Sequence, residues 1–555
     1  MLAKRDMKRA SSLQQILGAM IAFALCFVCV SYGEAQHSKT AQRVAWNPDN
    51  GDGTYKNPVI FADYSDPDVI RVGDDFYLTA SSFNCAPGLP ILHSKDLVNW
   101  RILAHVFQRQ HPTEVFCKPQ HGNGVWAPAI RKHNGEFFIF YGDPDFGIYR
   151  TKTRNAGGPW SAPQLIHAAK GWIDPCPFWD EDGKAYLVRA WARSRSGIQS
   201  ILTLHRMSAD GTSLLDEGKT IFDGHAKHPT IEGPKLYKRN GYYYIFAPAG
   251  GVTRGWQTVL RSKTIDGPYE DRIVMEQGKT EINGPHQGAW VELKSGEAWF
   301  MHFQDRGAYG RVVHLQPMRW VDDWPVIGAD ADGDGKGEPV LVHKMPDVGR
   351  QFASVAPQTS DEFGRITLGL QWQWHANNEP KWFSLSSRPG WLRLAALSIP
   401  ENAENLWSVP NLLLQKFPAP AFVVTTRFNF SSLEQKEQAG LIVMGTDYSY
   451  IALERTPSGT RIKRVVCTDA PSSAREVVQA SASLEGKEAF LRVSVDASAI
   501  CRFSFSHDQK VFEPLGEAFV AKPGRWIGAK VGLFAVAQGR GGRSGFAEFD
   551  WFRVE

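Results

Sequence analysis

The feature that most constrains the fold is an internal repeat in the first 340 residues. Five segments share one order: a polar or acidic residue beside proline or glycine, a short apolar strand, a turn, and an aromatic-rich strand. They read DPDVIRVGDDFYL from Asp66, APAIRKHNGEFFIFY from Ala127, DPCPFWDEDGKAYLV from Asp174, EGPKLYKRNGYYYIFA from Glu232 and QGAWVELKSGEAWFMHF from Gln287. Each predicts a β-hairpin. Repeats of roughly 45–60 residues built from short strands are typical of a propeller, so we predict five blades over residues 45–335.

The residues that open these repeats are expected to meet at one end of the central channel, because the innermost strand of each blade starts beside the axis. Asp66, Asp174 and Glu232 would then bring three carboxylates together from three blades. Like charges in proximity cost free energy that folding alone does not justify. An aspartate before proline can also simply cap a turn. Three acids at equivalent positions nevertheless favour a functional site.

Composition excludes several other classes of protein. The 555 residues carry 62 Lys+Arg against 58 Asp+Glu, a formal charge of +4, which lacks the basic excess of a nucleic-acid binder. At 43% hydrophobic residues the chain is too apolar to be disordered. Beyond the N-terminal segment, five widely spaced cysteines give no dense disulfide framework and little support for a zinc site. One disulfide is compatible with export, but ordinary buried thiols are favoured.

The N-terminus has the layout of a secretory signal. It begins with four basic residues, Lys4, Arg5, Lys8 and Arg9, followed by an apolar stretch from Ile16 to Val30 and small or polar residues to Ala35. The apolar stretch is short for the roughly 20 residues that span a bilayer. We therefore predict a signal peptide over residues 1–35 and a secreted or periplasmic protein with no membrane anchor after cleavage.

The second half of the chain predicts a separate all-β domain. Strands with alternating polarity, such as FVVTTRFNF, AGLIVMG and FLRVSVD, favour an antiparallel β-sandwich over residues 350–555, after a linker at 336–349. The segment GADADGDGKGEP before it imitates the start of an EF-hand loop through Asp330, Asp332 and Asp334. Its twelfth position is Leu341 instead of glutamate, so we interpret it as a solvated Asp/Gly segment, with local calcium binding as the lesser alternative.

Carboxylates that converge in an aromatic pocket suit glycoside hydrolysis. One carboxyl group must donate a proton to the leaving oxygen, and another must be ionised to activate water or to attack. A third can tune the acid through like-charge repulsion. A metal hydrolase would need a first shell of histidine and carboxylate ligands, and His286 is the only histidine at a repeat opening.

Four of the repeat segments resemble a known family. SDPDVIRVGDDFYLTASSF, WAPAIRKHNGEFFIFYG, GWIDPCPFWDEDGKAYLV and TIEGPKLYKRNGYYYIFAPAG, in this order, are similar to glycoside hydrolase family 43, the five-bladed propeller β-xylosidases and α-L-arabinofuranosidases. The C-terminal half looks like the concanavalin-like β-sandwich that follows the propeller in the xylosidase branch. The resemblance covers nearly the whole mature chain and implies a substrate derived from xylan, arabinoxylan or arabinan.

The resemblance also implies an inverting mechanism with three assigned carboxylates. Asp66 in SDPD matches the general base, Asp174 in IDP matches the residue that modulates the pKa of the acid, and Glu232 in IEGPK matches the general acid. Asp68 is the obvious rival to Asp66, but only Asp66 occupies the family's base position. An inverting site separates acid and base by about 6.5–9.5 Å, which leaves room for the water.

Further positions follow from the same resemblance. His286 in GPHQG matches a channel histidine that helps to hold a hydrated cation, often calcium, although no cofactor is expected for the chemistry itself. Arg311 in GRVVHLQP matches an arginine that contacts the sugar. Phe83 and Trp126 are candidate pocket-wall aromatics. The alternatives are a metal-free channel histidine, a surface ion pair and buried blade packing.

Some alternatives remain open from sequence. Where known xylosidases carry an aromatic-rich stretch, this chain has Asn84-Cys85-Ala86-Pro87-Gly88, so the choice between xylose and arabinofuranose is undecided. We expect the sandwich to lend a loop to the pocket rim, which favours exo action on oligosaccharides. The competing hypotheses are a non-catalytic carbohydrate-binding propeller and an endo-arabinanase, which would need an open cleft.

Overall fold

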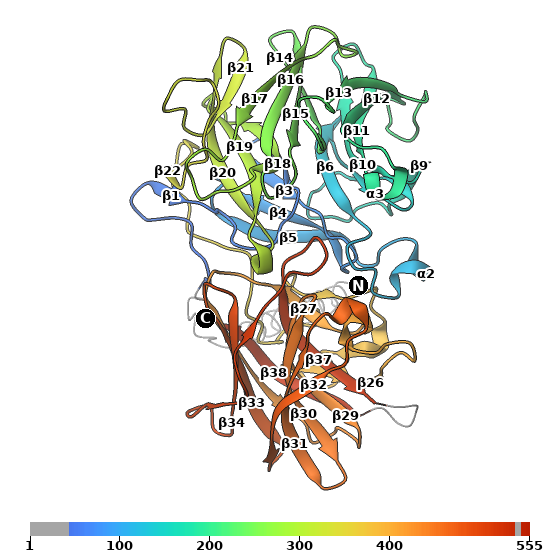
Figure 1. Ribbon diagram of the computed structural model, residues 1–555, viewed down its shortest axis with the longest axis vertical. Coiled ribbons are helices and arrows are strands. Elements are labelled where there is room, and N and C mark those ends of the chain that lie inside the picture. The colour runs from blue at the N-terminus through green and yellow to red at the C-terminus, as the bar shows by residue number, and fades with distance from the viewer. Residues whose placement is uncertain (1–43, 539–544) are drawn as a thin grey trace, which may run out of the picture. The chain divides into compact units, whose positions relative to one another are not determined.

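The computed structural model describes residues 44–538 and 545–555, and the predicted signal peptide lies outside them. These residues form five four-stranded sheets in chain order, followed by two eight-stranded sheets (Figure 1). The predicted all-β fold, a five-bladed propeller followed by a β-sandwich, is confirmed.

Each blade is an antiparallel meander whose strands pair in chain order. The first blade contains β2 (Asp68–Val72), β3 (Asp75–Thr79), β4 (Gly88–Ser94) and β5 (Trp100–Phe107). The second contains β6 (Trp126–His133), β7 (Glu136–Asp143), β8 (Gly147–Thr153) and β9 (Gln164–Ala168). The third contains β10 (Trp172–Trp179), β11 (Ala185–Trp191), β12 (Ile201–Met207) and β13 (Lys219–Asp223).

The last two blades follow the same plan. The fourth contains β14 (Lys235–Arg239), β15 (Tyr242–Ala249), β16 (Trp256–Ser262) and β17 (Glu270–Met275). The fifth contains β18 (His286–Glu292), β19 (Ala298–Asp305), β20 (Arg311–Val321) and β21 (Trp324–Ile327). A short pair, β1 (Thr54–Lys56) with β22 (Val342–Lys344), joins the segments before and after the propeller.

Turn chemistry explains the hairpins at the inner strands. Asn134 and Gly135 have φ of 47° and 79° between β6 and β7, and Asn240 and Gly241 have 49° and 73° between β14 and β15. Two consecutive left-handed residues make the turn that matches the twist of paired strands, and Asn-Gly favours it. The helices α2 (Thr113–Phe116) and α3 (Arg193–Ser196) are single turns. In the described part of the chain, no helix reaches the length and apolarity needed to cross a bilayer.

The sandwich consists of two sheets with a shared apolar core. One sheet has the order β23 (Gln373–Trp374), β27 (Leu413–Lys416), β37 (Lys530–Ala537), β29 (Glu437–Met444), β30 (Tyr448–Thr456), β31 (Gly459–Cys467) and β32 (Val477–Leu484), with β26 (Leu397–Ser398) beside β37. The other has the order β24 (Phe383–Ser384), β25 (Leu392–Ala395), β38 (Phe546–Val554), β28 (Phe422–Asn429), β33 (Glu488–Val495), β34 (Ile500–Ser506) and β35 (Glu513–Pro514), with β36 (Phe519–Val520) beside β34.

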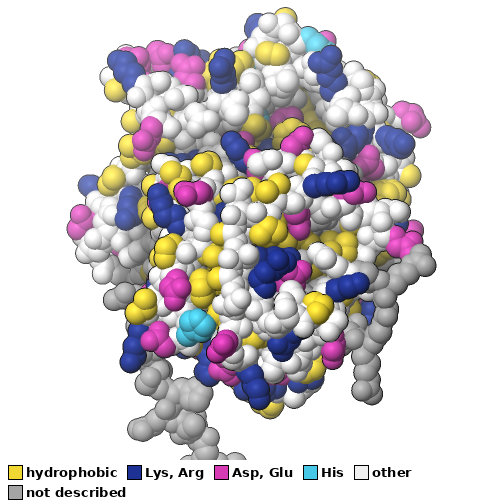
Figure 2. Space-filling view, turned by 60° about the horizontal axis from the view of Figure 1, so that its bottom comes forward, with side chains coloured by type: hydrophobic (Ala, Val, Ile, Leu, Met, Phe, Trp, Pro, Cys, Tyr) yellow, Lys and Arg dark blue, Asp and Glu magenta, His cyan; other side chains and the backbone are white. Residues whose placement is uncertain are grey.

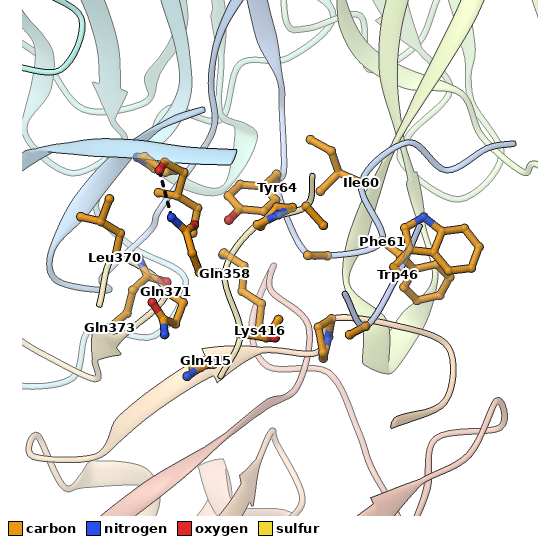
Figure 3. Close-up of a pocket in the computed structure, with 18 of the residues that line it drawn as sticks. Trp46, Ile60, Phe61, Tyr64, Gln358, Leu370, Gln371, Gln373, Gln415 and Lys416 are labelled. Carbon is orange, nitrogen blue, oxygen red and sulfur yellow. Dashed lines mark hydrogen bonds between the residues drawn. The ribbon is translucent and has the colours of Figure 1, made fainter. Parts of the chain in front are cut away.

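The sandwich packs directly on the propeller. The Ala86 and Trp374 backbones form a β-bridge, and the Asn84 side-chain amide donates to the carbonyl of His375 at 2.8 Å. The Ala529 N–H donates to the carbonyl of Ala308 at 2.7 Å. Figure 3 shows a narrow cavity between the two domains, lined by side chains from both. The segment Asn84–Gly88 is therefore held by the second domain.

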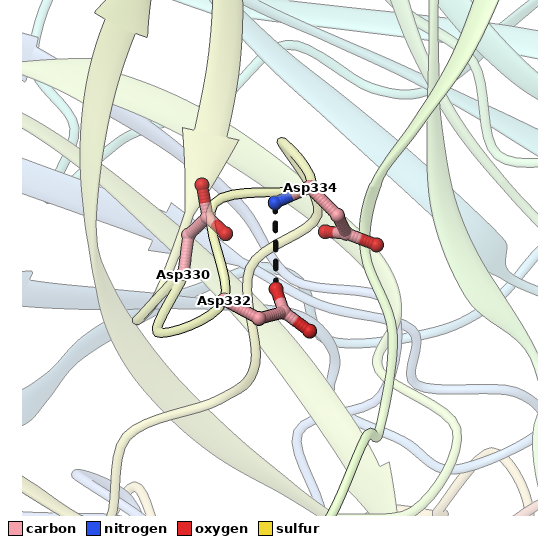
Figure 4. Close-up of side chains that lie close together, drawn as sticks. All are labelled: Asp330, Asp332 and Asp334. Carbon is pink, nitrogen blue, oxygen red and sulfur yellow. Dashed lines mark hydrogen bonds between the residues drawn. The ribbon is translucent and has the colours of Figure 1, made fainter.

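The acidic segment after β21 is a surface loop (Figure 4). The ligand atoms of Asp330, Asp332 and Asp334 lie within 4.8 Å of one another. Asp330 accepts hydrogen bonds from Arg319 at 3.0 Å and from the Gly333 N–H at 2.9 Å. These contacts fit the interpretation as a solvated Asp/Gly turn, and calcium binding there stays untested.

Two further sequence interpretations can be compared with the structure. Cys85, Cys176, Cys467 and Cys501 are buried free thiols, as expected, whereas the free thiol of Cys117 is exposed. On the face shown in Figure 2, basic and acidic side chains are interspersed, so that face carries no broad basic patch.

Candidate active site

The five residues that open the repeats line one pocket. Asp66, Ala127, Asp174, Glu232 and Gln287 surround a space of about 450 Å³, open mouth included. The predicted convergence at one end of the channel is confirmed. The other lining residues are Phe83, Trp126, Ile173, Val252, Arg311 and Trp526.

Strained backbone is concentrated around this pocket. Of its eleven lining residues, six are non-glycine residues with left-handed φ between 35° and 62°: Asp66, Phe83, Ala127, Asp174, Gln287 and Trp526. Such conformations cost on the order of 1–3 kcal/mol each and gather at functional sites. The pairing register also shifts at the start of β6, β10 and β18. Bulges of this kind redirect side chains out of a sheet, here into the pocket.

Asp66 is a buried carboxylate surrounded by donors. Its Oδ2 accepts hydrogen bonds from the hydroxyls of Ser65 at 2.7 Å and Ser81 at 2.5 Å, and its Oδ1 lies 3.3 Å from Nη1 of Arg311. Three donors fix the orientation of the carboxylate. Asp68, its rival from sequence, lines no part of the pocket and instead pairs with Arg131 at 2.6 Å.

Asp174 is the most deeply buried of the three acids, with 2% of its surface exposed. Its Oδ2 accepts a hydrogen bond from the Gly233 N–H at 2.7 Å and a longer one from the Gln287 amide at 3.4 Å. Burial raises the pKa of Asp174 well above its ordinary value, and the charges of Glu232 and Asp66 raise it further. Asp174 therefore holds a proton to a higher pH than an isolated aspartate does.

Glu232 is the most accessible of the three acids, with 29% of its side chain exposed. Its Oε1 lies 2.9 Å from Nε2 of His286, which is fully buried. The other ring nitrogen of His286, Nδ1, has no hydrogen-bond partner. His286 therefore orients Glu232 from behind and does not itself line the pocket.

The expectation that His286 helps to hold a hydrated cation stays a prediction. Calcium binds six to eight oxygen ligands. Within residues 44–538 and 545–555, the only cluster of three metal-ligating side chains is the Asp330 group, and it lacks His286.

The remaining predicted residues lie at the pocket. Arg311 is 7% exposed and is no surface ion pair: its Nη1 lies 2.6 Å from the Ser65 hydroxyl, and its guanidinium lies 4.8 Å from the centre of the Phe303 ring. Phe83 is buried in the wall, and Trp126 is half-buried with its indole N–H bonded to the Gly122 carbonyl at 2.8 Å.

Sequence reasoning missed several lining or supporting residues. Gln287 opens the fifth repeat, so the logic that selected the acids would also have found it. Ser65 and Ser81 carry no signal of their own. Trp526 comes from the sandwich, between β36 and β37; it is 53% exposed and meets Trp126 edge-on at 6.3 Å. The expectation that the sandwich lends a loop to the pocket rim is thereby confirmed.

Comparisons with known proteins agree with this architecture. Residues 55–325 match the model of glycosyl hydrolases family 43, and residues 360–555 match that of the beta-xylosidase C-terminal concanavalin A-like domain. A putative beta-xylosidase of Xylanibacter ruminicola is 41% identical over 88% of this chain and 87% of its own length. The chain belongs to glycosyl hydrolase family 43. It is a glycoside hydrolase.

Other family 43 proteins resemble it along both domains. A non-reducing end alpha-L-arabinofuranosidase of Bacteroides ovatus is 28% identical over 90% of this chain and 94% of its own. The crystal structure of a xylan beta-1,4-xylosidase from Bacillus halodurans superposes with a TM-score of 0.79 at 26% identity, over 90% of this chain and 99% of that one. Both xylosidases and arabinofuranosidases thus occur among its relatives.

Proposed function

We propose that this family 43 enzyme is an exported, inverting exo-glycosidase. It removes single β-D-xylosyl or α-L-arabinofuranosyl residues from oligosaccharides of xylan, arabinoxylan or arabinan. The observation that carries the proposal is the pocket itself, in which three carboxylates from three blades face a small space partly covered by Trp526. Export rests on the layout of residues 1–35 alone.

The three acids divide the chemistry between them. Glu232, the most accessible, donates a proton to the glycosidic oxygen as the bond from that oxygen to the anomeric carbon breaks. Asp66, held by Ser65 and Ser81, takes a proton from the water that attacks the opposite face of that carbon. Asp174, the residue expected to modulate the pKa of the acid, lies behind the site and fixes the Gly233 backbone next to the acid. One water is consumed and the configuration inverts.

The covered pocket favours exo over endo action. Trp526 and Trp126 meet at the mouth, and a pocket covered by the second domain suits a chain end better than the middle of a polymer. The relatives named for xylose and for arabinofuranose support a pentose but do not choose between the two. A purely binding propeller would gain nothing from burying Asp174 beside two further acids.

The deciding experiment compares aryl β-D-xylopyranoside with aryl α-L-arabinofuranoside and follows the released sugar by NMR. We expect hydrolysis of at least one substrate, with the inverted anomer appearing first. Release of the retained anomer would overturn the assignment of Asp66 as base. Failure to hydrolyse either substrate would overturn the pentosidase proposal. The Asp66→Asn variant serves as the inactive control.

A further inference from the structure

We infer that Asp63 is a positioning residue that ties the pocket arginine, Arg311, to the sandwich loop carrying Trp526. The inference rests on the proposed function. Asp63 is 3% exposed. Its Oδ1 accepts a hydrogen bond from the backbone N–H of Arg311 at 2.9 Å, and its Oδ2 accepts one from the backbone N–H of Gly528 at 3.0 Å. One carboxylate thus joins the fifth blade to the second domain.

The backbones around this carboxylate approach too closely for side chains. A Cβ on Gly310, where φ is 72°, would lie 2.5 Å from Cγ of Asp63. A Cβ on Gly528 would lie 2.7 Å from the Gly310 nitrogen. The neighbouring Ala529 N–H bonds the Ala308 carbonyl at 2.7 Å. The carboxylate is therefore fixed by backbone on both sides, in contacts that leave little room for adjustment.

Both backbone segments that Asp63 holds lead to the pocket. Arg311 carries its guanidinium to Ser65 and Asp66, as described above. Trp526 stands two residues before Gly528 and lies with its ring 5.7 Å from the Arg311 guanidinium. The Trp526 side chain is half exposed and its backbone has a positive φ, so its own contacts hold it weakly. The nearest hydrogen bond that anchors this loop is the one from the Gly528 N–H to Asp63.

A buried cation complements the carboxylate from the sandwich side. Lys416, on β27, lines the cavity between the domains (Figure 3). The negative charge of Asp63 acts to raise the pKa of Lys416. Burial lowers the pKa of Lys416 to about 8, and the attraction of Asp63 opposes that fall. Lys416 is thus charged at neutral pH. The domain whose loop Asp63 holds therefore also supplies a positive charge that attracts the Asp63 carboxylate.

The test measures the coupling between Asp63 and Trp526. Asp63→Asn keeps the size but replaces one acceptor by an amide that cannot accept from an N–H. We expect this variant to raise KM for the preferred aryl pentoside about tenfold and to change kcat less than threefold. A tenfold change is the size expected when one hydrogen bond to a charged group is lost. In a Trp526→Ala background the same substitution should raise KM less than twofold, because the loop no longer contributes.

The matched control is Asp361→Asn in the sandwich. Asp361 also accepts backbone hydrogen bonds, from Phe363 at 2.9 Å and Gly369 at 3.3 Å, but it lines no part of the pocket. Its substitution should lower Tm and leave KM unchanged. If Asp63→Asn behaves the same way, or raises KM equally with and without Trp526, the inference is wrong.

A measurement on the wild-type chain covers the case in which Asp63→Asn does not fold. Hydrogen exchange should be slow at the Gly528 amide and fast at the exposed Arg525–Trp526 amides. Equally fast exchange at all three would overturn the inference. This measurement needs no substrate. It therefore distinguishes an error in the role of Asp63 from an error in the proposed function.

Discussion

Removal of the Trp526 side chain is the sharpest test of the covered pocket. Trp526→Ala deletes the one lining residue that comes from the sandwich and leaves the three carboxylates in place. The substitution does not change the backbone strain at position 526, because φ is 62° there and alanine, like tryptophan, has a Cβ. The variant therefore reports on the contact between the indole and the substrate.

The expected effect follows from exposed area. A tryptophan presents about 150–250 Å². With 53% exposed, some ~80–130 Å² of Trp526 is open to solvent. If a bound sugar covers half of that, the contact contributes about 1–1.6 kcal/mol at ~25 cal/mol per Å². We thus expect KM to rise roughly 5- to 15-fold with kcat nearly unchanged, because the indole touches the substrate in ground state and transition state alike.

The assay compares kcat and KM on the preferred aryl pentoside and on the corresponding disaccharide. Val511→Ala is the control, because Val511 is 68% exposed on the sandwich and lines no part of the pocket. A rise in KM below twofold on both substrates would refute the view that Trp526 covers the bound sugar. So would a loss confined to kcat.

Three further predictions test the charged groups. Glu232→Gln should lower kcat on a disaccharide about 10²- to 10⁴-fold but much less on an aryl glycoside with an acidic leaving group, which needs less protonation; equal losses on both would contradict its role as the acid. The pKa of Asp174 is raised above 3.8, so the wild type loses stability as the pH rises through that pKa. Asp174→Asn removes this ionisation, so its Tm should increase relative to that of the wild type as the pH increases. The same variant should have a lower kcat, because Asp174 lies at the active site. A Tm difference independent of pH would speak against this. The pKa of Lys416 is lowered from 10.5 to about 8, so its positive charge destabilises the folded state. This destabilisation is greatest below pH 8 and becomes smaller as the pH rises toward 10.5. Lys416→Met should therefore increase the free energy of unfolding at pH 7 by up to about 3 kcal/mol, measured by urea denaturation, and no gain at pH 7 would disprove it.

The propeller and the three acids were predictable because the repeat is local and periodic. Asn134-Gly135 and Asn240-Gly241 set hairpin turns from two adjacent residues. The openings of the repeats then placed Asp66, Asp174 and Glu232 by symmetry, with no knowledge of distant contacts.

The residues that escaped prediction act across the chain. Trp526 reaches the pocket from the other domain, and Asp63 bonds Gly528, so no local pattern marks either. The backbone places Asp66 and Asp68 differently, because β2 begins at Asp68 and leaves Asp66 before it with φ of 56°. The contact of His286 with Glu232 was also not predicted, since the two residues are 54 positions apart.

The left-handed residues around the pocket also limit how such a site can diverge. β-Branched side chains are poorly tolerated at positive φ, so valine, isoleucine and threonine are disfavoured at Asp66, Phe83, Asp174 and Gln287 whatever the substrate. A change of sugar preference must then come mainly from positions with ordinary backbone, such as Ile173 and Val252, or from the loop that the second domain contributes. In a family with one scaffold and several pentoses, sequence comparison at those few positions should separate the specificities better than comparison of the acids.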